Sequence, residues 1–360
     1  MSLNLLENYG ISQRFIQEAT LYPEYSLGRV IAQHKGMYRI ASAEGERFAE
    51  ISGKFSYEVE TLSQYPAVGD FVMVSIGNTD SPAIIHKILT RKSVFQRAAL
   101  GLIHQAQVIA ANIDMVFICM SLNQNYNLSR LERYLSIAWD SGATPVILLT
   151  KSDLCENILQ IMEEIETVAI GCDVIVTSSF DAKTVEKLAP FLKKGITASF
   201  IGSSGVGKST LINLLAGTQL LATAEIDQYD KGRHTTTGRE MFLLPNGAIV
   251  IDTPGMRELG IANGDMEKTF SDIEELAKHC KFRDCSHNNE PGCAVQKAIS
   301  EGLLENRRLQ NYFKLKRETD YEGLSSKEIE EKKLNEMFRE VGGMKKAKHH
   351  IKSLKKSGHH

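Results

Sequence analysis

The sequence feature that most constrains the fold is a glycine-rich stretch at residues 202–209, which fits the phosphate-loop pattern G-x-x-x-x-G-K-[ST]. The apolar run 198–201 before it predicts a strand, and residues 210–215 after it predict a helix. Glycines let backbone N–H groups turn inward around phosphates, and the N-terminus of the helix adds a partial positive charge. The stretch therefore predicts a P-loop nucleotide-binding site. Its expected contacts are Gly202, Ser203, Ser204, Gly205, Val206, Gly207, Lys208, Ser209 and Thr210.

A second anchor is expected downstream, where the apolar run 248–251 ends in Asp252. An apolar strand that ends in aspartate is the Walker B arrangement, which holds Mg²⁺ in P-loop NTPases. Lys208 is expected to neutralise the β- and γ-phosphates, and Ser209 to ligate Mg²⁺. The backbone N–H of Gly255 is predicted to approach the γ-phosphate.

Residues 231–238 lie between these anchors and predict a switch loop that becomes ordered when GTP binds. Thr236 is the predicted Mg²⁺ ligand and γ-phosphate sensor, with Thr235 as the alternative. Met256 stands where Ras-like enzymes carry the glutamine that orients the attacking water, so slow intrinsic hydrolysis is predicted. His234 is the candidate for positioning that water, and a side chain facing solvent or RNA is the alternative.

Two short motifs predict the choice of base. Residues 150–153 resemble the N-K-x-D motif of GTPases, in which the carboxylate accepts hydrogen bonds from the guanine N1–H and 2-amino groups. Adenine lacks that pair of donors, so Asp153 favours guanine and disfavours an ATPase. A second motif, residues 177–179, resembles the S-A-x loop that contacts the guanine edge. The expected base-site residues are Thr150, which replaces the usual Asn, and Lys151, Ser152, Asp153, Thr177, Ser178 and Ser179.

The order of the motifs is the most informative part of the pattern. Ordinary GTPases place the phosphate loop first and the base motifs last, whereas here residues 150–153 and 177–179 precede 202–209. Strands alternate with helices from residue 113 onward, which predicts a parallel sheet covered by helices on both faces. The sequence therefore predicts a circularly permuted α/β P-loop GTPase domain at about residues 93–260.

The flanking segments predict different structures. Residues 1–25 predict a polar, partly helical leader, and residues 26–92 predict a small β-barrel from five short strand candidates. RNA binding by that barrel, or a barrel without a ligand, both remain open. Residues 261–343 predict a mainly helical domain, with helices over 306–318 and 326–340. The basic tail 344–360 predicts either a contact with an anionic partner or a solubilising end.

A cluster of cysteines lies near the start of that helical domain. Cys₃His is a closed ligand set typical of structural Zn²⁺, and the cluster predicts one such ion. Buried cysteines with a chance histidine are the alternative reading, and His279 is the alternative nitrogen ligand. The predicted ligands are Cys280, Cys285, His287 and Cys293.

Bulk composition adds little about partners. Hydrophobic residues make up 42% and charged residues 24% of the 360, with a net charge of −2. The apolar runs are of strand length, and the N-terminus lacks the pattern of a signal peptide. These features predict a cytoplasmic protein without a membrane partner.

Taken together, these motifs resemble the RsgA family, also called YjeQ or YloQ, of bacterial GTPases that depend on the small ribosomal subunit. The resemblance covers about residues 26–320 and rests on T-K-S-D before G-S-S-G-V-G-K-S, G-R-H-T-T-T-G, D-T-P-G-M-R-E-L and the cysteine cluster. It implies an OB-fold barrel and GTP hydrolysis stimulated by the 30S subunit during its late maturation. It also implies contact with 16S rRNA through the flanking domains, and release after hydrolysis.

The expected partners are GTP or GDP, with Mg²⁺, and the 30S subunit, and the chain is expected to act as a monomer. Two other functions stay open: a nucleotide-gated RNA-binding scaffold, and a permuted GTPase that acts on the large subunit.

Overall fold

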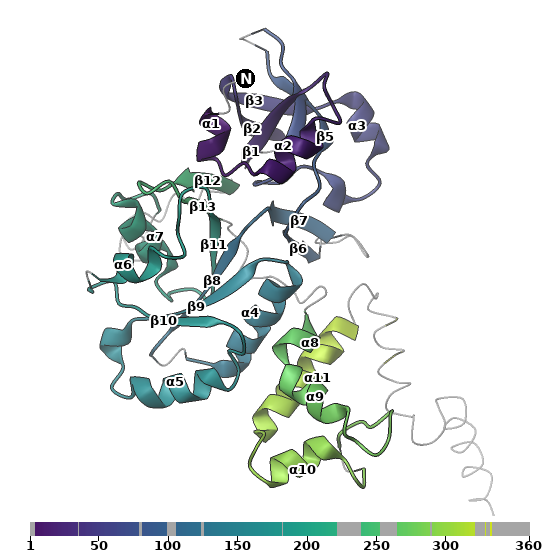
Figure 1. Ribbon diagram of the computed structural model, residues 1–360, viewed down its shortest axis with the longest axis vertical. Helices are drawn as coiled ribbons and strands as arrows, with labels where there is room; N and C mark the ends of the chain where they lie inside the picture. Colours follow the sequence, from purple (N-terminus) through teal and green to yellow (C-terminus); the bar gives the residue numbers. More distant parts are fainter. Residues whose placement is uncertain are drawn as a thin grey trace, which may run out of the picture.

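The computed structural model describes residues 4–34, 36–78, 81–98, 106–123, 126–181, 183–221, 239–252, 265–288 and 290–320, with residues 328 and 332. Figure 1 shows three parts stacked along the long axis: a barrel at one end, a central sheet with helices, and a small helical lobe at the other end. Within this described part, no helix is long and apolar enough to cross a bilayer.

The first part is a closed barrel of five strands, as the sequence predicts. Each strand pairs with two neighbours around the ring, in the order β1-β2-β3-β5-β4 and back to β1. Two short helices of the leader and one helix between β3 and β4 lie around it. The elements are α1 (Asn4–Asn8), α2 (Gln13–Ala19), β1 (Ser26–His34), β2 (Met37–Ser42), β3 (Gly45–Ile51), α3 (Gly53–Glu58), a 3₁₀ turn (Leu62–Gln64), β4 (Phe71–Ser75) and β5 (Ala83–Ile88).

The second part is an α/β sheet in which five strands run parallel, in the order β10-β9-β8-β11-β13, with antiparallel β12 beyond β13. A separate hairpin, β6 with β7, connects it to the barrel. The elements are β6 (Val94–Ala98), β7 (Ala106–Ala111), β8 (Met115–Ser121), α4 (Leu128–Asp140), β9 (Thr144–Thr150), a 3₁₀ turn (Ser152–Leu154), α5 (Ile158–Glu166), β10 (Asp173–Val176), α6 (Thr184–Leu188), β11 (Thr197–Ile201), α7 (Lys208–Ala216), β12 (Arg239–Leu243) and β13 (Ile249–Asp252).

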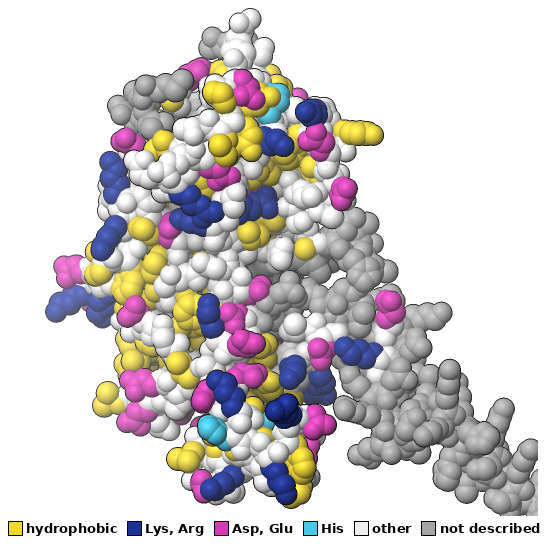
Figure 2. All heavy atoms as spheres, turned by 45° about the vertical axis from the view of Figure 1, so that its right-hand side comes forward, with side chains coloured by type: hydrophobic (Ala, Val, Ile, Leu, Met, Phe, Trp, Pro, Cys, Tyr) yellow, Lys and Arg dark blue, Asp and Glu magenta, His cyan; other side chains and the backbone are white. Residues whose placement is uncertain are grey.

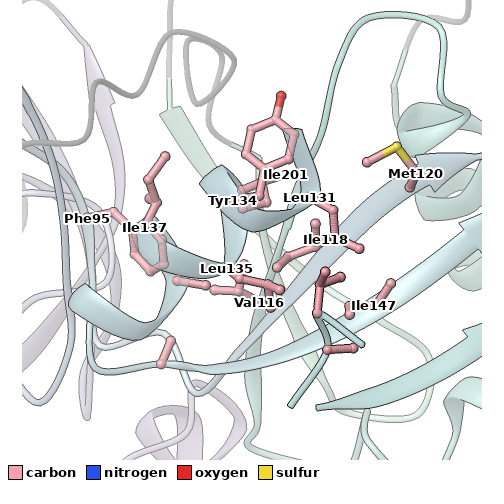
Figure 3. Close-up of a cluster of buried hydrophobic side chains, with 14 of the residues drawn as sticks. Phe95, Val116, Ile118, Met120, Leu131, Tyr134, Leu135, Ile137, Ile147 and Ile201 are labelled. Atoms are coloured by element: carbon pink, nitrogen blue, oxygen red, sulfur yellow. The ribbon is translucent and has the colours of Figure 1, made fainter. Parts of the chain in front are cut away.

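Strand alternation explains why both faces of this sheet are covered. On β8, Val116 and Ile118 belong to one buried cluster, which α4 and α5 cover, while Phe117 belongs to another, which α6 and α7 cover. Successive side chains of a strand point to opposite faces, so a continuous apolar strand needs helices on both sides. Figure 3 shows Leu131 and Leu135 of α4 packed over these strands.

The third part consists of short helices that attach to α4. They are α8 (Met266–Thr269), α9 (Ser271–Ala277), α10 (Ala294–Ser300) and α11 (Asn306–Asp320). Glu132 of α4 is fully buried at this junction, and Arg308 of α11 donates to its Oε1 at 2.9 Å. Arg308 also donates to both carboxylate oxygens of Asp272, each at 2.7 Å, so one guanidinium joins α4, α9 and α11. Except for residues 328 and 332, the helix predicted over 326–340 lies outside the described residues.

One strand joins the barrel to the central sheet. Residues 26–29 of β1 pair with β4 and so close the barrel, whereas Ala32 and Gln33 pair with Glu240 and Arg239 of β12. The register of β1 on β2 shifts between Val30 and Ala32. An irregularity of this kind bends a strand and increases its twist, which lets β1 leave the barrel and enter the second sheet.

Arg29 fixes this junction from inside. Its side chain is fully buried and donates to backbone carbonyls of Tyr9, Gly69 and Asn112 and to Thr197 Oγ1. Burial lowers the pKa of Arg29 to about 10, so the guanidinium remains charged at neutral pH. The leader, the barrel, the β7–β8 connection and β11 therefore share one buried cation.

We expect the substitution Arg29→Met to destabilise the protein by about 3 kcal/mol, because it leaves several buried acceptors without their donor. Chemical denaturation followed by tryptophan fluorescence would measure the loss. Arg14→Met removes an exposed arginine of α2 and serves as the control. An unfolding midpoint equal to that of the unaltered protein would contradict this role of Arg29.

Candidate functional site

The phosphate-loop segment lies where β11 ends and α7 begins. Gly202, Gly205 and Gly207 adopt φ values of 144°, 75° and 93°, in the left-handed region that favours glycine. A Cβ on Gly202 would lie 2.4 Å from the carbonyl oxygen of Cys119, so no side chain fits at this position. Lys208 Nζ donates to the carbonyl oxygens of Gly202 and Ser203, each at 2.7 Å. The loop thus curls around its own lysine.

Neighbouring residues complete this edge of the sheet. Asp252 is the last residue of β13, which pairs in parallel with β11, so it lies at the same strand ends as the loop. Val206 is buried, Ser209 is half-buried in the first turn of α7, and Ser204 and Thr210 are exposed. The other predicted residues of this site, His234, Thr235, Thr236, Gly255 and Met256, lie outside the described residues.

The structure brings the two base motifs together beside the loop. Ser178 Oγ donates to Asp153 Oδ1, and the backbone N–H of Ser152 donates to the carbonyl of Thr177 at 3.2 Å. Lys151 adopts a left-handed backbone with φ 57°. Asp153 and Ser179 are exposed, so the carboxylate lies at the protein surface.

Thr150 occupies the position of the usual asparagine in the base motif, and its contacts show what the threonine does there. It is buried at the end of β9, and its Oγ1 donates to the carbonyl oxygen of Val206 at 2.6 Å. Val206 belongs to the phosphate loop, so the hydroxyl ties the base motif directly to that loop. A threonine can therefore hold the two motifs at a fixed separation without an amide.

One residue that the sequence did not single out also reaches the loop. Arg130, in the first turn of α4, donates from Nη1 to Ser203 Oγ at 3.2 Å. Its position on the polar side of an amphipathic helix gave no signal of this contact, because such positions are usually solvated.

The predicted metal ligands converge. The ligand atoms of Cys280, Cys285, His287 and Cys293 all lie within 4.8 Å of one another. By contrast, the His279 side chain is largely exposed and pairs with Glu275, so the structure favours His287 as the nitrogen ligand. His287 adopts φ 56°, and Gln296 Nε2 donates to its carbonyl at 2.6 Å. The backbone of this loop is thus held by the first turn of α10.

The donor set fits one Zn²⁺ ion. Tetrahedral Zn²⁺ with the usual bond lengths places two sulfurs about 3.8 Å apart and a sulfur and a nitrogen about 3.6 Å apart. The Sγ atoms of Cys280 and Cys293 are 3.9 Å apart, and each lies 3.6 Å from His287 Nδ1. Burial alone would raise the pKa of Cys280, but hydrogen bonds from the N–H groups of Ala294 and Val295 and from the Cys285 and Cys293 thiols together lower it. Burial raises the pKa of the neighbouring Cys285 to about 11, so without a metal ion the thiolate is favoured at Cys280.

The comparisons with known proteins agree with this geometry. A family model described as RsgA GTPase matches residues 88–262. The chain is 47% identical to the small ribosomal subunit biogenesis GTPase RsgA 2 of Lactiplantibacillus plantarum, over 97% of this chain and 98% of that protein. It is 48% identical to RsgA 2 of Listeria monocytogenes, over 88% of this chain and 90% of that protein.

The chain belongs to the RsgA family of GTPases. Solved structures of the family share its fold. YjeQ from Thermotoga maritima aligns with a TM-score of 0.61 at 26% identity, over 82% of this chain and 98% of that one. YloQ, described as a circularly permuted GTPase, aligns with a TM-score of 0.57 at 26% identity, over 82% and 95% of the two chains. These comparisons confirm the permuted fold expected from the order of the motifs and the GTP hydrolase activity expected from the resemblance to the RsgA family.

We expect Thr150→Val to weaken GDP binding by about three- to tenfold, the effect of one lost hydrogen bond at a buried acceptor. Thr150→Ser keeps the hydroxyl and should bind GDP nearly as the unaltered protein does. Titration with a fluorescent GDP analogue would measure both. Equal affinities for the Val and Ser variants would remove the Thr150–Val206 contact from the account of the base site.

We expect the purified protein to contain about one Zn²⁺ per chain. Cys285→Ala should lose the metal and lower the melting temperature while GDP binding stays intact, because the cluster lies outside the central sheet. Elemental analysis and a calorimetric scan would test this. Cys155→Ala, which alters a cysteine outside the cluster, is the matched control. Metal-free protein prepared without chelator would contradict the zinc assignment.

Proposed function

We propose that this RsgA protein hydrolyses GTP in response to the small ribosomal subunit, acts in the late maturation of that subunit, and is released after hydrolysis. The observation that carries the proposal is the attachment of a flanking part to each side of the nucleotide site. The relatives named as small ribosomal subunit biogenesis GTPases support the choice of partner.

The barrel is attached through β12, the strand that follows the predicted switch loop 231–238. Besides the β1 pairing, Arg39 of β2 forms an ion pair with Glu240, and Arg239 Nη1 donates to Gln33 Oε1 at 3.4 Å. A partner that displaces the barrel would therefore also displace β12, the strand next to the predicted switch loop 231–238. This contact supports coupling between barrel occupancy and the state of the nucleotide.

The helical lobe is attached through α4. Arg307 and Asn311 of α11 join Arg308 around the buried carboxylate of Glu132. A buried carboxylate with this many partners resists separation, because removing one partner leaves a charge without compensation. The contact supports transmission of force from the lobe to the central sheet.

Exposed aromatic and basic side chains on both flanking parts suit rRNA. On the barrel, Phe48 and Tyr57 are 57% and 91% exposed, and the side chain of Lys54 lies 85% exposed on the same helix as Tyr57. Between the predicted zinc ligands Cys280 and Cys285, Phe282 is 41% exposed beside Lys281. Aromatic rings stack on bases, and basic groups contact phosphates. Figure 2 shows further Lys and Arg side chains over the helical lobe at the bottom of the view.

Several of the predicted site residues have distinct roles in GTP binding and hydrolysis. Lys208 holds the β- and γ-phosphates, Asp153 selects guanine, and Asp252 supports the Mg²⁺ site. Ser209 and Thr236 would ligate Mg²⁺, which when bound neutralises charge on the phosphates. Gly255 would donate its N–H to the γ-phosphate, and His234 would position water in place of the glutamine that Met256 replaces.

The proposed division of the chain follows the same scheme: an OB-fold at 26–92, the GTPase at 93–260 and the zinc domain at 261–343. We place the protein in the cytoplasm as a monomer that binds 16S rRNA, with the tail 344–360 as a further basic surface.

We expect 30S subunits to accelerate GTP hydrolysis by at least about tenfold, as partners do for GTPases that lack a complete water-positioning set. The stimulation should weaken as salt rises, because phosphate contacts release counterions. Phosphate release would be measured with 30S, with 50S and with neither, and Lys208→Ala would give the blank. Equal stimulation by 50S would overturn the partner, and no stimulation by either would favour a nucleotide-gated scaffold.

A further inference from the structure

Arg130 lies where the helix that carries the C-terminal lobe meets the phosphate loop. It is the third residue of α4, and the side chain of Asn127 caps this helix by accepting from the Arg130 N–H at 2.9 Å. Its own side chain is half-buried and reaches Ser203 Oγ across a sequence separation of 73 residues. The roles proposed above make no use of this residue.

The position of Arg130 is fixed by its neighbours on α4. Leu131 is fully buried in the core that α4 shares with β8 and β9, as Figure 3 shows. Glu132 is fully buried against Arg308 of the helical lobe. Three successive residues thus point to the loop, the core and the lobe. Because Leu131 and Glu132 fix α4 on two sides, the Arg130 side chain has little freedom, and its contact with Ser203 is pre-organised.

Two cationic side chains donate hydrogen bonds to Ser203. Lys208 Nζ donates to its carbonyl oxygen at 2.7 Å, and Arg130 Nη1 donates to its hydroxyl at 3.2 Å. In a P-loop GTPase the lysine side chain serves the phosphates, and catalysis depends on fixed positive charge where negative charge develops. A half-buried guanidinium next to the same residue adds to that charge, with less screening than at the open surface.

We propose that Arg130 is a positioning residue for GTP hydrolysis: through Ser203 it holds the phosphate loop and adds positive charge beside it. The guanidinium acts on the chemical step more than on nucleotide binding, because the guanine contacts at Asp153 and the Thr150–Val206 bond do not involve it. A nucleoside diphosphate such as GDP should therefore bind almost as well when the Arg130 guanidinium is removed.

The test measures intrinsic GTP hydrolysis without ribosomal particles, so its result does not depend on the proposed partner. Arg130→Ala should lower kcat by about tenfold, which is less than an arginine that touches the γ-phosphate directly contributes. GDP affinity should stay within about twofold, and Arg130→Lys should recover part of kcat because it keeps the charge. Arg133→Ala, one turn further along α4, removes an arginine that pairs with Glu318 instead and should keep kcat.

A double-variant cycle separates positioning from general stability. If Arg130 acts through Ser203, Ser203→Ala should lower kcat in the same direction, and the double variant should lose less than the sum of the two effects. An unchanged kcat in Arg130→Ala would overturn the proposal. So would a parallel loss of GDP binding and melting temperature with no recovery in Arg130→Lys, since that result indicates only a structural contact.

Discussion

A buried positive charge determines how the barrel and the GTPase sheet can be joined. Arg29 is enclosed by carbonyl oxygens from the leader, the barrel and the β7–β8 connection, with a hydroxyl from β11. Taking a guanidinium out of water is unfavourable unless these acceptors surround it, so the four segments must assemble together. The shared strand β1 follows from the same requirement, because Arg29 stands just before the point where β1 leaves the barrel for β12.

A buried negative charge has the equivalent role at the other end of the central sheet. Glu132 is held by basic and amide groups of α11, and it lies two residues from the arginine that contacts the phosphate loop. The nucleotide site therefore lies between two junctions in which charge, rather than apolar area alone, sets the geometry. Such junctions tolerate little sliding, since a small displacement breaks hydrogen bonds that water cannot replace.

The parts of the fold that the sequence predicted well are those with strong local patterns. The apolar runs 198–201 and 248–251 became β11 (Thr197–Ile201) and β13 (Ile249–Asp252), close to their predicted bounds, because buried parallel strands are apolar on both faces. The glycine-rich loop and the cysteine cluster were found because their residue types are needed at fixed spacing. The zinc-ligand choice between His279 and His287 needed the structure, since both lie close to the cysteines in sequence.

Long-range features escaped prediction for a physical reason. β12 is short and begins with Arg239 and Glu240, so its composition resembles an exposed turn until β1 is seen beside it. Arg29, Arg130 and Glu132 look like ordinary surface charges, because burial of a charge is decided by partners that lie far away in the chain. The Thr150 hydroxyl likewise reads as a departure from a motif until Val206 is found within hydrogen-bonding distance.

The pairing of β1 with β12 also has a consequence for synthesis on the ribosome. Gln33 and Arg239, which face each other across this pair, are 206 residues apart. At a synthesis rate of about 5–20 residues per second, roughly 10–40 s pass between the synthesis of the end of β1 and the synthesis of its partner strand β12. During this time the end of β1 has unpaired N–H and C=O groups, which can pair with strands other than β12. The permuted order of the GTPase segments lengthens this interval, during which β1 has its barrel partners β2 and β4, but not β12, to pair with.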